Sequence, residues 1–259
     1  MSKVLVLGDI HGRKFWKNPC KTIDSYDKVV FLGDYLDPYQ FEDINVKDAI
    51  ENFAEIIDLK KNNPEKVVLL IGNHDLPYFS DDYYALSNYH CRHSDTYHDT
   101  IHKMFNDNLG LFQIAHVVDD ALFTHAGVDS GWLEQTVGCT SDDIHVICDD
   151  LNKITNDPSG WRKLYCVSYR RGGDDEFASC VWADINDINS DWLSAKNVLR
   201  PSKAIHTIKQ VFGHTLQAYY GDDDRIMYGE PLEFGNHKML DVARPFLLDT
   251  KSFTLTPLC

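Results

Sequence analysis

Short apolar runs alternate with polar segments along the first third of the chain. Val4–Gly12 begins with Val and Leu and ends in a turn at its glycines. Lys28–Leu32 and Lys66–Ile71 are similar apolar runs, each followed directly by a glycine. Each run has the length and β-branched content of a buried strand. Apolar residues recur at helical spacing in Val46–Lys60, and Arg13–Thr22 predicts a shorter helix. This alternation predicts an α/β sheet with parallel strands at its centre.

The second half of the chain predicts a second sheet. We expect strands over Phe112–Val118, Ala121–Thr124 and Gln210–Phe212, and a helix over Asp142–Ile154. After Thr215, short alternating segments and turns predict antiparallel strands that complete this sheet.

Two segments lack a clear periodic pattern. Asn156–Asp191 contains Pro-Ser-Gly and Gly-Gly breaks, which predict loops over a functional site. Asp81–His102 is rich in Tyr, His and Asp, and we interpret it as a partly exposed lid or a pair of surface helices. A separate metal site is the alternative, although the spacing of its histidines fits no zinc template.

Composition limits the domain number, the partners and the compartment. With 259 residues, 43% of them hydrophobic, and neither repeat nor linker, we expect one domain over residues 1–259. The formal charge of −15 argues against a general nucleic-acid or membrane-surface binder. Bound divalent cations can reverse the local charge of a site, so an anionic substrate stays compatible.

The cysteines and the hydropathy pattern indicate a cytoplasmic protein. The seven cysteines have irregular spacing and form no CxxC pair, which favours free thiols in a reducing compartment. No leader pattern opens the chain and no apolar run approaches about 18 residues, so we expect neither a signal peptide nor a membrane span.

Metal-binding side chains follow five of the predicted strands. Because parallel strands end at one edge of a sheet, these side chains are expected to meet where α/β sheets bind ligands. They are Asp9, His11, Asp34, Asn73, His74, His125 and His214. Oxygen and imidazole ligands without thiolate suit Mn, Fe, Zn or Mg, and six ligands drawn from these seven side chains exceed the needs of one catalytic ion. Two ions about 3.5–4 Å apart would use them all and could orient a phosphate and generate hydroxide.

The order of these motifs resembles the calcineurin-like metallophosphoesterase superfamily. The motifs are GDIHG (Gly8–Gly12), GDYLD (Gly33–Asp37), GNHD (Gly72–Asp75), THAG (Thr124–Gly127) and GHT (Gly213–Thr215). The form of the last two is similar to the branch with Ser/Thr phosphoprotein phosphatases and symmetrical diadenosine tetraphosphatases. The resemblance implies a four-layer αββα sandwich with the dimetal site at the strand ends.

The resemblance also implies a role for each motif residue. Asp9 and His11 would bind the first ion and Asp34 would bridge the two. Asn73, His125 and His214 would complete the second ion, with Mn as the first expectation. His74 would then be the general acid for the leaving oxygen, oriented by Asp37.

Two departures from the branch affect phosphate binding. The branch usually continues GDxxDRG, with an arginine that grips the phosphate, whereas Pro38 and Tyr39 follow Asp37 here and Ile71 precedes GNHD. Val181–Asp184 is similar to the branch's WSDP segment, near which a loop arginine reaches the phosphate. Four candidates follow, in this order of preference: Arg170 and Arg171, then Arg13, then Arg92.

The functional hypothesis is a dimetal phosphomonoesterase that acts on phosphoprotein or on a small phosphorylated molecule. The first alternative is hydrolysis of a nucleotide phosphodiester or of a dinucleoside polyphosphate. A non-catalytic metal-binding scaffold is the alternative from another class, and the presence of His74 with every ligand position argues against it.

Overall fold

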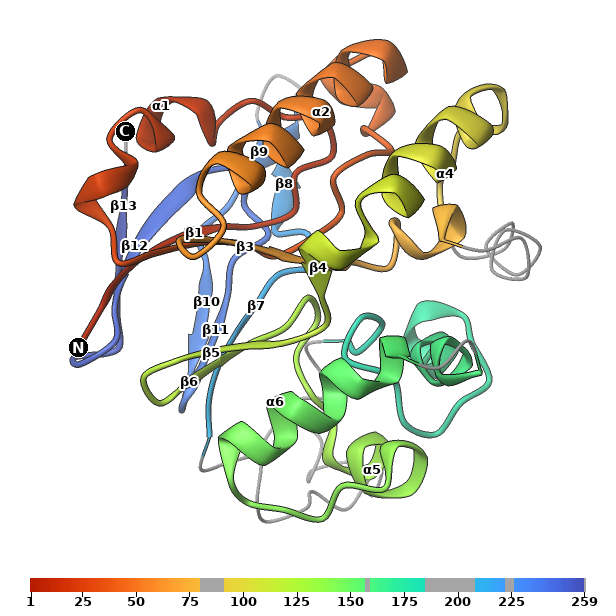
Figure 1. Ribbon diagram of the computed structural model, residues 1–259, viewed down its shortest axis with the longest axis vertical. Coiled ribbons are helices and arrows are strands. Elements are labelled where there is room, and N and C mark those ends of the chain that lie inside the picture. Colours follow the sequence, from red (N-terminus) through yellow and green to blue (C-terminus); the bar gives the residue numbers. More distant parts are fainter. Residues whose placement is uncertain (80–90, 157–158, 185–207, 222–225, 259) are drawn as a thin grey trace. The chain divides into compact units, whose positions relative to one another are not determined.

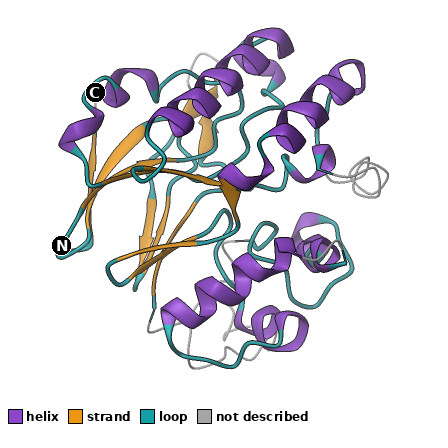
Figure 2. Cartoon of the chain, viewed as in Figure 1, coloured by secondary structure: helices purple, strands orange, loops and turns teal. Residues whose placement is uncertain are grey.

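The computed structural model describes residues 1–79, 91–156, 159–184, 208–221 and 226–258, which form two compact units. The first unit comprises Met1–Gln113, Gln217–Glu230 and Val242–Cys259, and the second comprises Ile114–Leu216 and Pro231–Asp241. Each unit contains one mixed sheet with helices packed on it (Figures 1 and 2). The expected α/β class with two mixed sheets and flanking helices is therefore confirmed. A single domain over residues 1–259 stays a prediction.

The first sheet has parallel strands at its centre, as the sequence predicted. Its strands, in order across the sheet, are β13 (Thr254–Pro257), β12 (Pro245–Asp249), β1 (Lys3–Leu7), β2 (Lys28–Phe31), β3 (Val67–Leu70) and β4 (Phe112–Gln113). Strands β1 to β4 run parallel, while β12 and β13 are antiparallel additions beside β1. The apolar side chains of β1, β2 and β3 are almost all inaccessible to solvent. Because both faces of these strands are buried, their sequences are continuous apolar runs.

Within the described residues, the first unit has the helices α1 (Lys17–Cys20), α2 (Val46–Asn62) and α4 (His98–Asp107). Asn45 begins α2, because its side chain accepts a hydrogen bond from the backbone N–H of Asp48 at 2.9 Å. The buried face of α2 packs on β3 and places Phe53 in an aromatic cluster with Tyr35 and Phe105 (Figure 1). The helix predicted over Arg13–Thr22 forms only as the short α1.

The second sheet also has a parallel centre. Its strands, in order across the sheet, are β10 (Leu232–Phe234), β11 (His237–Met239), β7 (Lys209–Phe212), β6 (Ala121–Phe123) and β5 (His116–Val118). Strands β6, β7 and β11 are parallel, whereas β5 and β10 pair antiparallel to their neighbours. In the part of this unit that the structure describes, the helices are α5 (Ser130–Trp132) and α6 (Ile144–Lys153), and α6 packs on β5 and β6 (Figure 1).

The strand predicted over Phe112–Val118 was wrong as one element. It divides into β4 and β5, which belong to different sheets and different units. The break falls at Ile114 and Ala115, whose backbone N–H groups both donate to the side-chain oxygen of Asn152, at 2.9 and 3.0 Å. Asn152 also donates to the carbonyl of Ala115 at 2.9 Å. A side chain from α6 thus satisfies backbone groups that a continuous strand would have paired in a sheet.

The C-terminal strands do not all complete the second sheet. Strands β10 and β11 do so, whereas β12 and β13 extend the first sheet, and β8 (Ala218–Tyr220) pairs with β9 (Ile226–Tyr228) in a separate two-stranded sheet. The edge of β1 requires a hydrogen-bonding partner, and the largely buried Pro245–Asp249 segment supplies one.

The segment predicted as loops, Asn156–Asp191, contains short helical turns where it is described, and residues 157–158 and 185–191 lie outside the described part. Among the described residues, the turns of 3₁₀ type are Ile23–Ser25, Gln40–Glu42, Leu76–Tyr78, Asp95–Tyr97, Leu109–Leu111, Ile154–Asn156, Gly160–Tyr165 and Tyr169–Arg171, and Leu133–Val137 is a π-turn. None of the helices in the described ranges has the length and apolar composition to cross a lipid bilayer. Of the seven cysteines, the six that lie in those ranges are free thiols.

Candidate metal centre

The strand ends of the first unit gather the predicted site residues. Asp9 and His11 follow β1, Asp34 follows β2, and Asn73 and His74 follow β3. Since β1, β2 and β3 are neighbouring parallel strands, their following loops lie at one edge of the sheet. All five side chains are buried. Ligand atoms of His11, Asp34 and His74 all lie within 4.8 Å of one another.

Unusual backbone conformations bring these loops together. His11, Asp34 and Asp37 have positive φ angles of 43°, 53° and 58°. Such conformations are unfavourable for residues with a side chain and concentrate at functional sites. Gly72 allows the close approach of the second and third loops, because a Cβ atom there would lie 2.1 Å from Oδ1 of Asp34. The same oxygen accepts the backbone N–H of His74 at 2.9 Å.

Asp75 fixes the loops after β2 and β3, and the sequence analysis gave it no role. Its carboxylate is fully buried and accepts the backbone N–H groups of Gly72, Asp34 and Tyr35 at 2.8, 2.9 and 3.1 Å. Burial and the nearby Asp34 carboxylate raise the pKa of Asp75, against these three hydrogen bonds. The signal was its place in the quoted GNHD motif, but two of its three partners, Asp34 and Tyr35, come from a loop about 40 residues earlier in the sequence.

His11 has the protonation pattern of a metal ligand. Its Nδ1 lies 2.9 Å from the carbonyl oxygen of Leu36, which can only accept, so Nδ1 carries the hydrogen. The lone pair is therefore on Nε2, which lies 3.5 Å from Oδ2 of Asp34. Burial holds the pKa of His11 well below its ordinary value, despite the attraction of Asp34. A neutral imidazole with its other nitrogen hydrogen-bonded to a carbonyl is the usual ligand form, so the site fits a divalent cation.

His74 is held in the orientation that a general acid requires. Its Nδ1 lies 3.2 Å from Oδ2 of Asp37 and 3.0 Å from the carbonyl oxygen of Arg92. Both partners are acceptors, so Nδ1 donates and Nε2 is the nitrogen that can exchange a proton with a substrate. Burial opposes protonation of His74, but the carboxylates of Asp34 and Asp37 outweigh it and raise the pKa of His74. Tyr78, which is also buried, donates its hydroxyl to Oδ1 of Asp37 at 2.6 Å.

A cysteine orients the amide of Asn73. Nδ2 of Asn73 donates to Sγ of Cys91 at 3.5 Å, and this thiol lies 3.4 Å from the carbonyl oxygen of Asn73. Burial raises the pKa of Cys91 well above its ordinary value, so the thiol is protonated and can donate to that carbonyl. An amide whose nitrogen donates to sulfur presents its oxygen as the ligand atom for a hard cation.

The second unit brings the two remaining histidines together. His125 follows β6 and His214 follows β7, and both are buried. Nε2 of His125 and Nδ1 of His214 are 3.2 Å apart. With metal–nitrogen distances of ~2.0–2.1 Å, two imidazoles on one ion have ligand atoms roughly 3.0–3.4 Å apart. This pair therefore has the spacing of two ligands of a common cation.

The arginines predicted to bind phosphate have different surroundings. Arg171 forms an ion pair with Asp184 at 3.1 Å and donates to Oγ1 of Thr215, the residue after His214, at 2.6 Å. Arg170 is exposed. Arg13 is buried in the first unit.

All three nitrogens of the Arg13 guanidinium have protein partners. Nε donates to Glu42, one terminal nitrogen donates to the carbonyl of Asp9 at 3.0 Å, and the other donates to the hydroxyl of Tyr228 at 2.9 Å. Arg13 therefore fixes the loop after β1.

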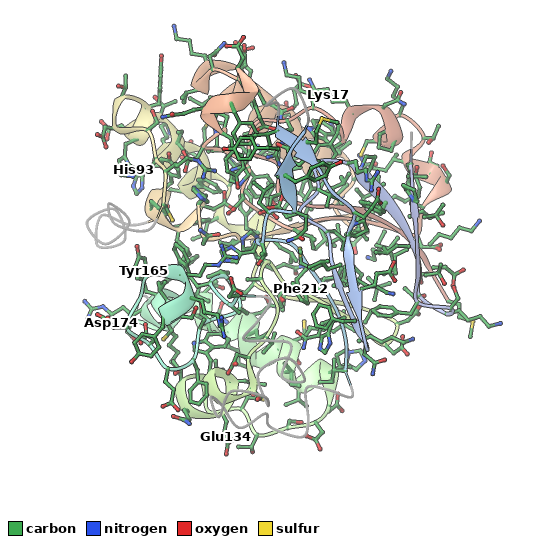
Figure 3. The ribbon with its side chains drawn as sticks, turned by 180° about the vertical axis from the view of Figure 1, so that it is seen from behind. Lys17, His93, Glu134, Tyr165, Asp174 and Phe212 are labelled. Carbon is green, nitrogen blue, oxygen red and sulfur yellow. The ribbon has the colours of Figure 1, made fainter. Side chains whose placement is uncertain are left out.

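The described histidines of the segment Asp81–His102 have structural partners. His93, at the margin of the first unit in Figure 3, pairs with Asp95 at 2.9 Å. His102 lies 2.8 Å from the carbonyl of Tyr78 and anchors α4. Within the described ranges, the side-chain groups spaced to hold a cation include no residue of this segment. Its residues 81–90 lie outside those ranges.

Comparisons with known proteins find similar sequences among phosphoesterases. The family model described as Calcineurin-like phosphoesterase matches residues 2–218. A protein of Encephalitozoon cuniculi named "Probable serine/threonine-protein phosphatase" is 30% identical over 129 residues, which are 49% of this chain and 26% of that protein. A protein of Schizosaccharomyces pombe named "Putative serine/threonine-protein phosphatase" is 27% identical over 133 residues, 48% of this chain and 39% of that protein. The chain thus matches well under half the length of these relatives.

A solved structure has the same fold. The crystal structure of a cold-active protein-tyrosine phosphatase of a psychrophilic Shewanella species matches with a TM-score of 0.51 and 15% identity, over 100% of this chain and 81% of that chain. At this identity, the likeness concerns the fold alone.

Proposed function

The chain belongs to the calcineurin-like phosphoesterase family, and on that premise we propose that it is a dimetal-dependent phosphomonoesterase of the phosphoprotein phosphatase kind. Membership makes it a phosphoester hydrolase of a family that uses divalent metals. The observation that supports catalysis over a metal-binding scaffold is His74, held by Asp37 beside the ligand atoms of His11 and Asp34.

We propose that six residues hold two divalent cations. Asp9 and His11 bind the first ion and Asp34 bridges both, while Asn73, His125 and His214 bind the second. The neutral His11, the oriented Asn73 amide and the His125–His214 spacing of 3.2 Å support this set. Oxygen and imidazole donors without thiolate favour Mn, with Fe, Zn or Mg as alternatives. When bound, the cations supply charge neutralisation for the phosphoryl group and a water that ionises near neutral pH.

The remaining chemistry belongs to the protein's own side chains. Protonated His74 gives the proton on Nε2 to the leaving oxygen, while Nδ1 keeps its hydrogen bonds to Asp37 and to the carbonyl of Arg92. Tyr78 holds the Asp37 carboxylate from its other oxygen. The imidazole therefore keeps one orientation through the reaction, which reduces the entropy lost at the transition state.

Arg171 is proposed to contact the phosphoryl group from the second unit. Its hydrogen bond to Thr215, next to His214, supports Arg171 over the exposed Arg170. Arg13 stays a weaker proposal because its guanidinium is already bonded to Glu42, Asp9 and Tyr228.

Replacing Arg171 by alanine should lower kcat/KM. The loss of transition-state stabilisation calculated from kcat/KM should be roughly 2–4 kcal/mol, by analogy with the loss of one oxyanion donor. Arg170→Ala is the matched control, since it removes a neighbouring guanidinium of the same loop, and metal content should not change in either variant. If neither variant lost more than about tenfold in kcat/KM, the pair would be a solvated charge cluster and the phosphate contact would lie elsewhere.

The substrate is proposed to be a phosphoprotein or a small phosphomonoester. The names of the two relatives support the first, and the chain's charge of −15 supports neither a nucleic-acid nor a membrane partner. The free thiols in the described ranges support a reducing cytoplasm as the compartment.

A substrate panel tests this function. The protein loaded with Mn, Mg or Zn is assayed on phosphoserine peptide, p-nitrophenyl phosphate, a bis-ester and a dinucleoside polyphosphate. Turnover of the monoesters at least tenfold above the other two supports the proposal. Preference for the bis-ester or the dinucleotide would establish the nucleotide alternative, and metal binding without turnover of any substrate would establish a scaffold.

A further inference from the structure

Arg92 places a guanidinium against the loop after β2, from a segment far along the chain. One terminal nitrogen donates to the carbonyl of Asp37 at 3.2 Å. Its central carbon lies 3.8 Å from the centre of the Tyr39 ring. Asp37 and Tyr39 are the two neighbours of Pro38, which has no side-chain donor. The residues before and after Pro38 thus both contact the Arg92 guanidinium.

This guanidinium lies near the predicted metal and proton-transfer residues of the first unit. The carbonyl of Arg92 is the second acceptor for Nδ1 of His74. The Tyr39 ring beneath its guanidinium also contacts the His11 ring edge-on, with centroids 4.9 Å apart. Burial lowers the pKa of His11, and the carboxylates of Asp34 and Asp37 raise the pKa of His74 against burial. The charge of Arg92 opposes protonation of both histidines.

Within the described ranges, the hydrogen bonds of Arg92 use few of its side-chain donors. Stacking on Tyr39 uses the face of the guanidinium, while its N–H groups lie in the plane and at the edge. One of those groups bonds to Asp37, and Nε is buried with no hydrogen-bond partner among the described residues. A buried donor left unmatched costs about 1–3 kcal/mol, which favours a ligand that can accept from it.

Arg92 also differs from Arg13 in its charge balance. Arg13 pairs with the carboxylate of Glu42, whereas no ion pair joins Arg92 to a carboxylate within the described ranges. A guanidinium that is ordered by stacking but lacks a carboxylate partner is arranged for an external anion, and its fork of N–H groups matches phosphate oxygens.

We infer that Arg92 binds a non-bridging oxygen of the phosphoryl group, in the substrate and in the inorganic phosphate product. This inference rests on the proposed phosphomonoesterase function and deepens it. Arg92 would thus supply a donor to the phosphoryl group in addition to the one proposed for Arg171. Tyr39 acts as the positioning residue for the guanidinium.

Binding of inorganic phosphate tests the inference independently of turnover. Arg92→Ala, Arg92→Lys and wild-type protein, each loaded with Mn, are titrated with inorganic phosphate by calorimetry, and kcat/KM is measured on p-nitrophenyl phosphate. Metal content and melting temperature are measured for each. Arg162→Ala is the control, because it removes an exposed arginine that is neither a proposed metal ligand nor a proposed phosphate contact.

The expected result is a loss of at least tenfold in phosphate affinity for Arg92→Ala. Its kcat/KM should fall by about 10²–10³-fold, the range for loss of one preorganised donor to a reacting oxyanion. Arg92→Lys should be intermediate, because it keeps the charge but not the fork. Millimolar guanidinium chloride should restore part of the activity of Arg92→Ala and should leave the activity of Arg162→Ala unchanged. Both variants should keep two ions.

Three results would overturn the inference. The first is wild-type phosphate affinity in Arg92→Ala together with wild-type kcat/KM. The second is loss of metal or a large drop in melting temperature in both Arg92 variants, which would indicate a structural role. The third is unchanged phosphate affinity with a loss of kcat that grows as the leaving group worsens, because Arg92 would then act through His74.

The inference and the proposed function fail in different ways. If the wild type bound phosphate through Arg92 but cleaved no monoester, the function would be wrong and the Arg92 contact would stand. If Arg92→Ala kept its phosphate affinity while the wild type cleaved monoesters, only the inference would be wrong.

Discussion

Removal of the bound cations is expected to abolish hydrolysis and to lower the melting temperature. Asp9 and Asp34 are each only 1% exposed, and without a cation the two carboxylates would carry uncompensated charge in a buried place. An ion that binds only the folded state adds about 2.7 kcal/mol to the free energy of unfolding at 100 times its dissociation constant. Dialysis against chelator, followed by calorimetry and assay, measures both effects. Full activity after prolonged dialysis in excess chelator would contradict the dimetal mechanism.

Asp34→Asn is expected to be the most damaging single substitution at the metal ligands. Asparagine keeps the shape of the side chain and can still accept the backbone N–H of His74. It removes the negative charge of the carboxylate that is proposed to bridge both ions. Occupancy of both ions should fall in Asp34→Asn, whereas Asn73→Ala should mainly weaken the second. Asp174→Asn is the matched control, since this exposed carboxylate lies at the margin of the second unit in Figure 3. Two ions still bound in Asp34→Asn would refute the bridging role.

Features set by local sequence could be predicted. Buried strands β1, β2 and β3 show as apolar runs, and α2 shows as an apolar stripe that begins at an Asn cap. The polar residues after these strands were predictable because parallel strands bring their carboxyl ends together. The structure gathers the predicted Asp9, His11, Asp34 and His74 in the first unit, and His125 with His214 in the second. Their roles as ligands stay predictions.

Features set by contacts between distant residues could not be predicted from periodicity. The split of Phe112–Val118 depends on Asn152, which lies 37 and 38 residues from the backbone groups that it satisfies. The alternating pattern of β12 and β13 would suit an edge strand of either sheet. In the structure, β12 pairs with the edge of β1, so both strands belong to the first sheet. In the same way, Tyr78 and Arg92 reach Asp37 across 41 and 55 residues. No local pattern marks these contacts.

His74→Gln is expected to slow hydrolysis of an alkyl phosphate by about 10²–10⁴-fold, the usual contribution of a general acid. The loss should be smaller on p-nitrophenyl phosphate, because this leaving group departs without a proton. Two ions should remain bound, since Nδ1 of His74 donates to Asp37 and to the carbonyl of Arg92 and its role requires no metal. Asp37→Asn should show the same dependence on the leaving group with a smaller loss, because it disturbs only the orientation of the imidazole.

The comparison between leaving groups separates this role from metal binding. The ligand atom of His74 lies within 4.8 Å of those of His11 and Asp34, so the distances alone would also allow His74 to hold a cation. A lost ligand would reduce metal content and slow both substrates alike, because the cations act on the phosphoryl group whatever its leaving group. A lost proton donor would leave metal content unchanged and slow only the substrate whose leaving oxygen needs the proton. Equal losses on both substrates, or one ion missing in His74→Gln, would therefore assign His74 to the metal centre.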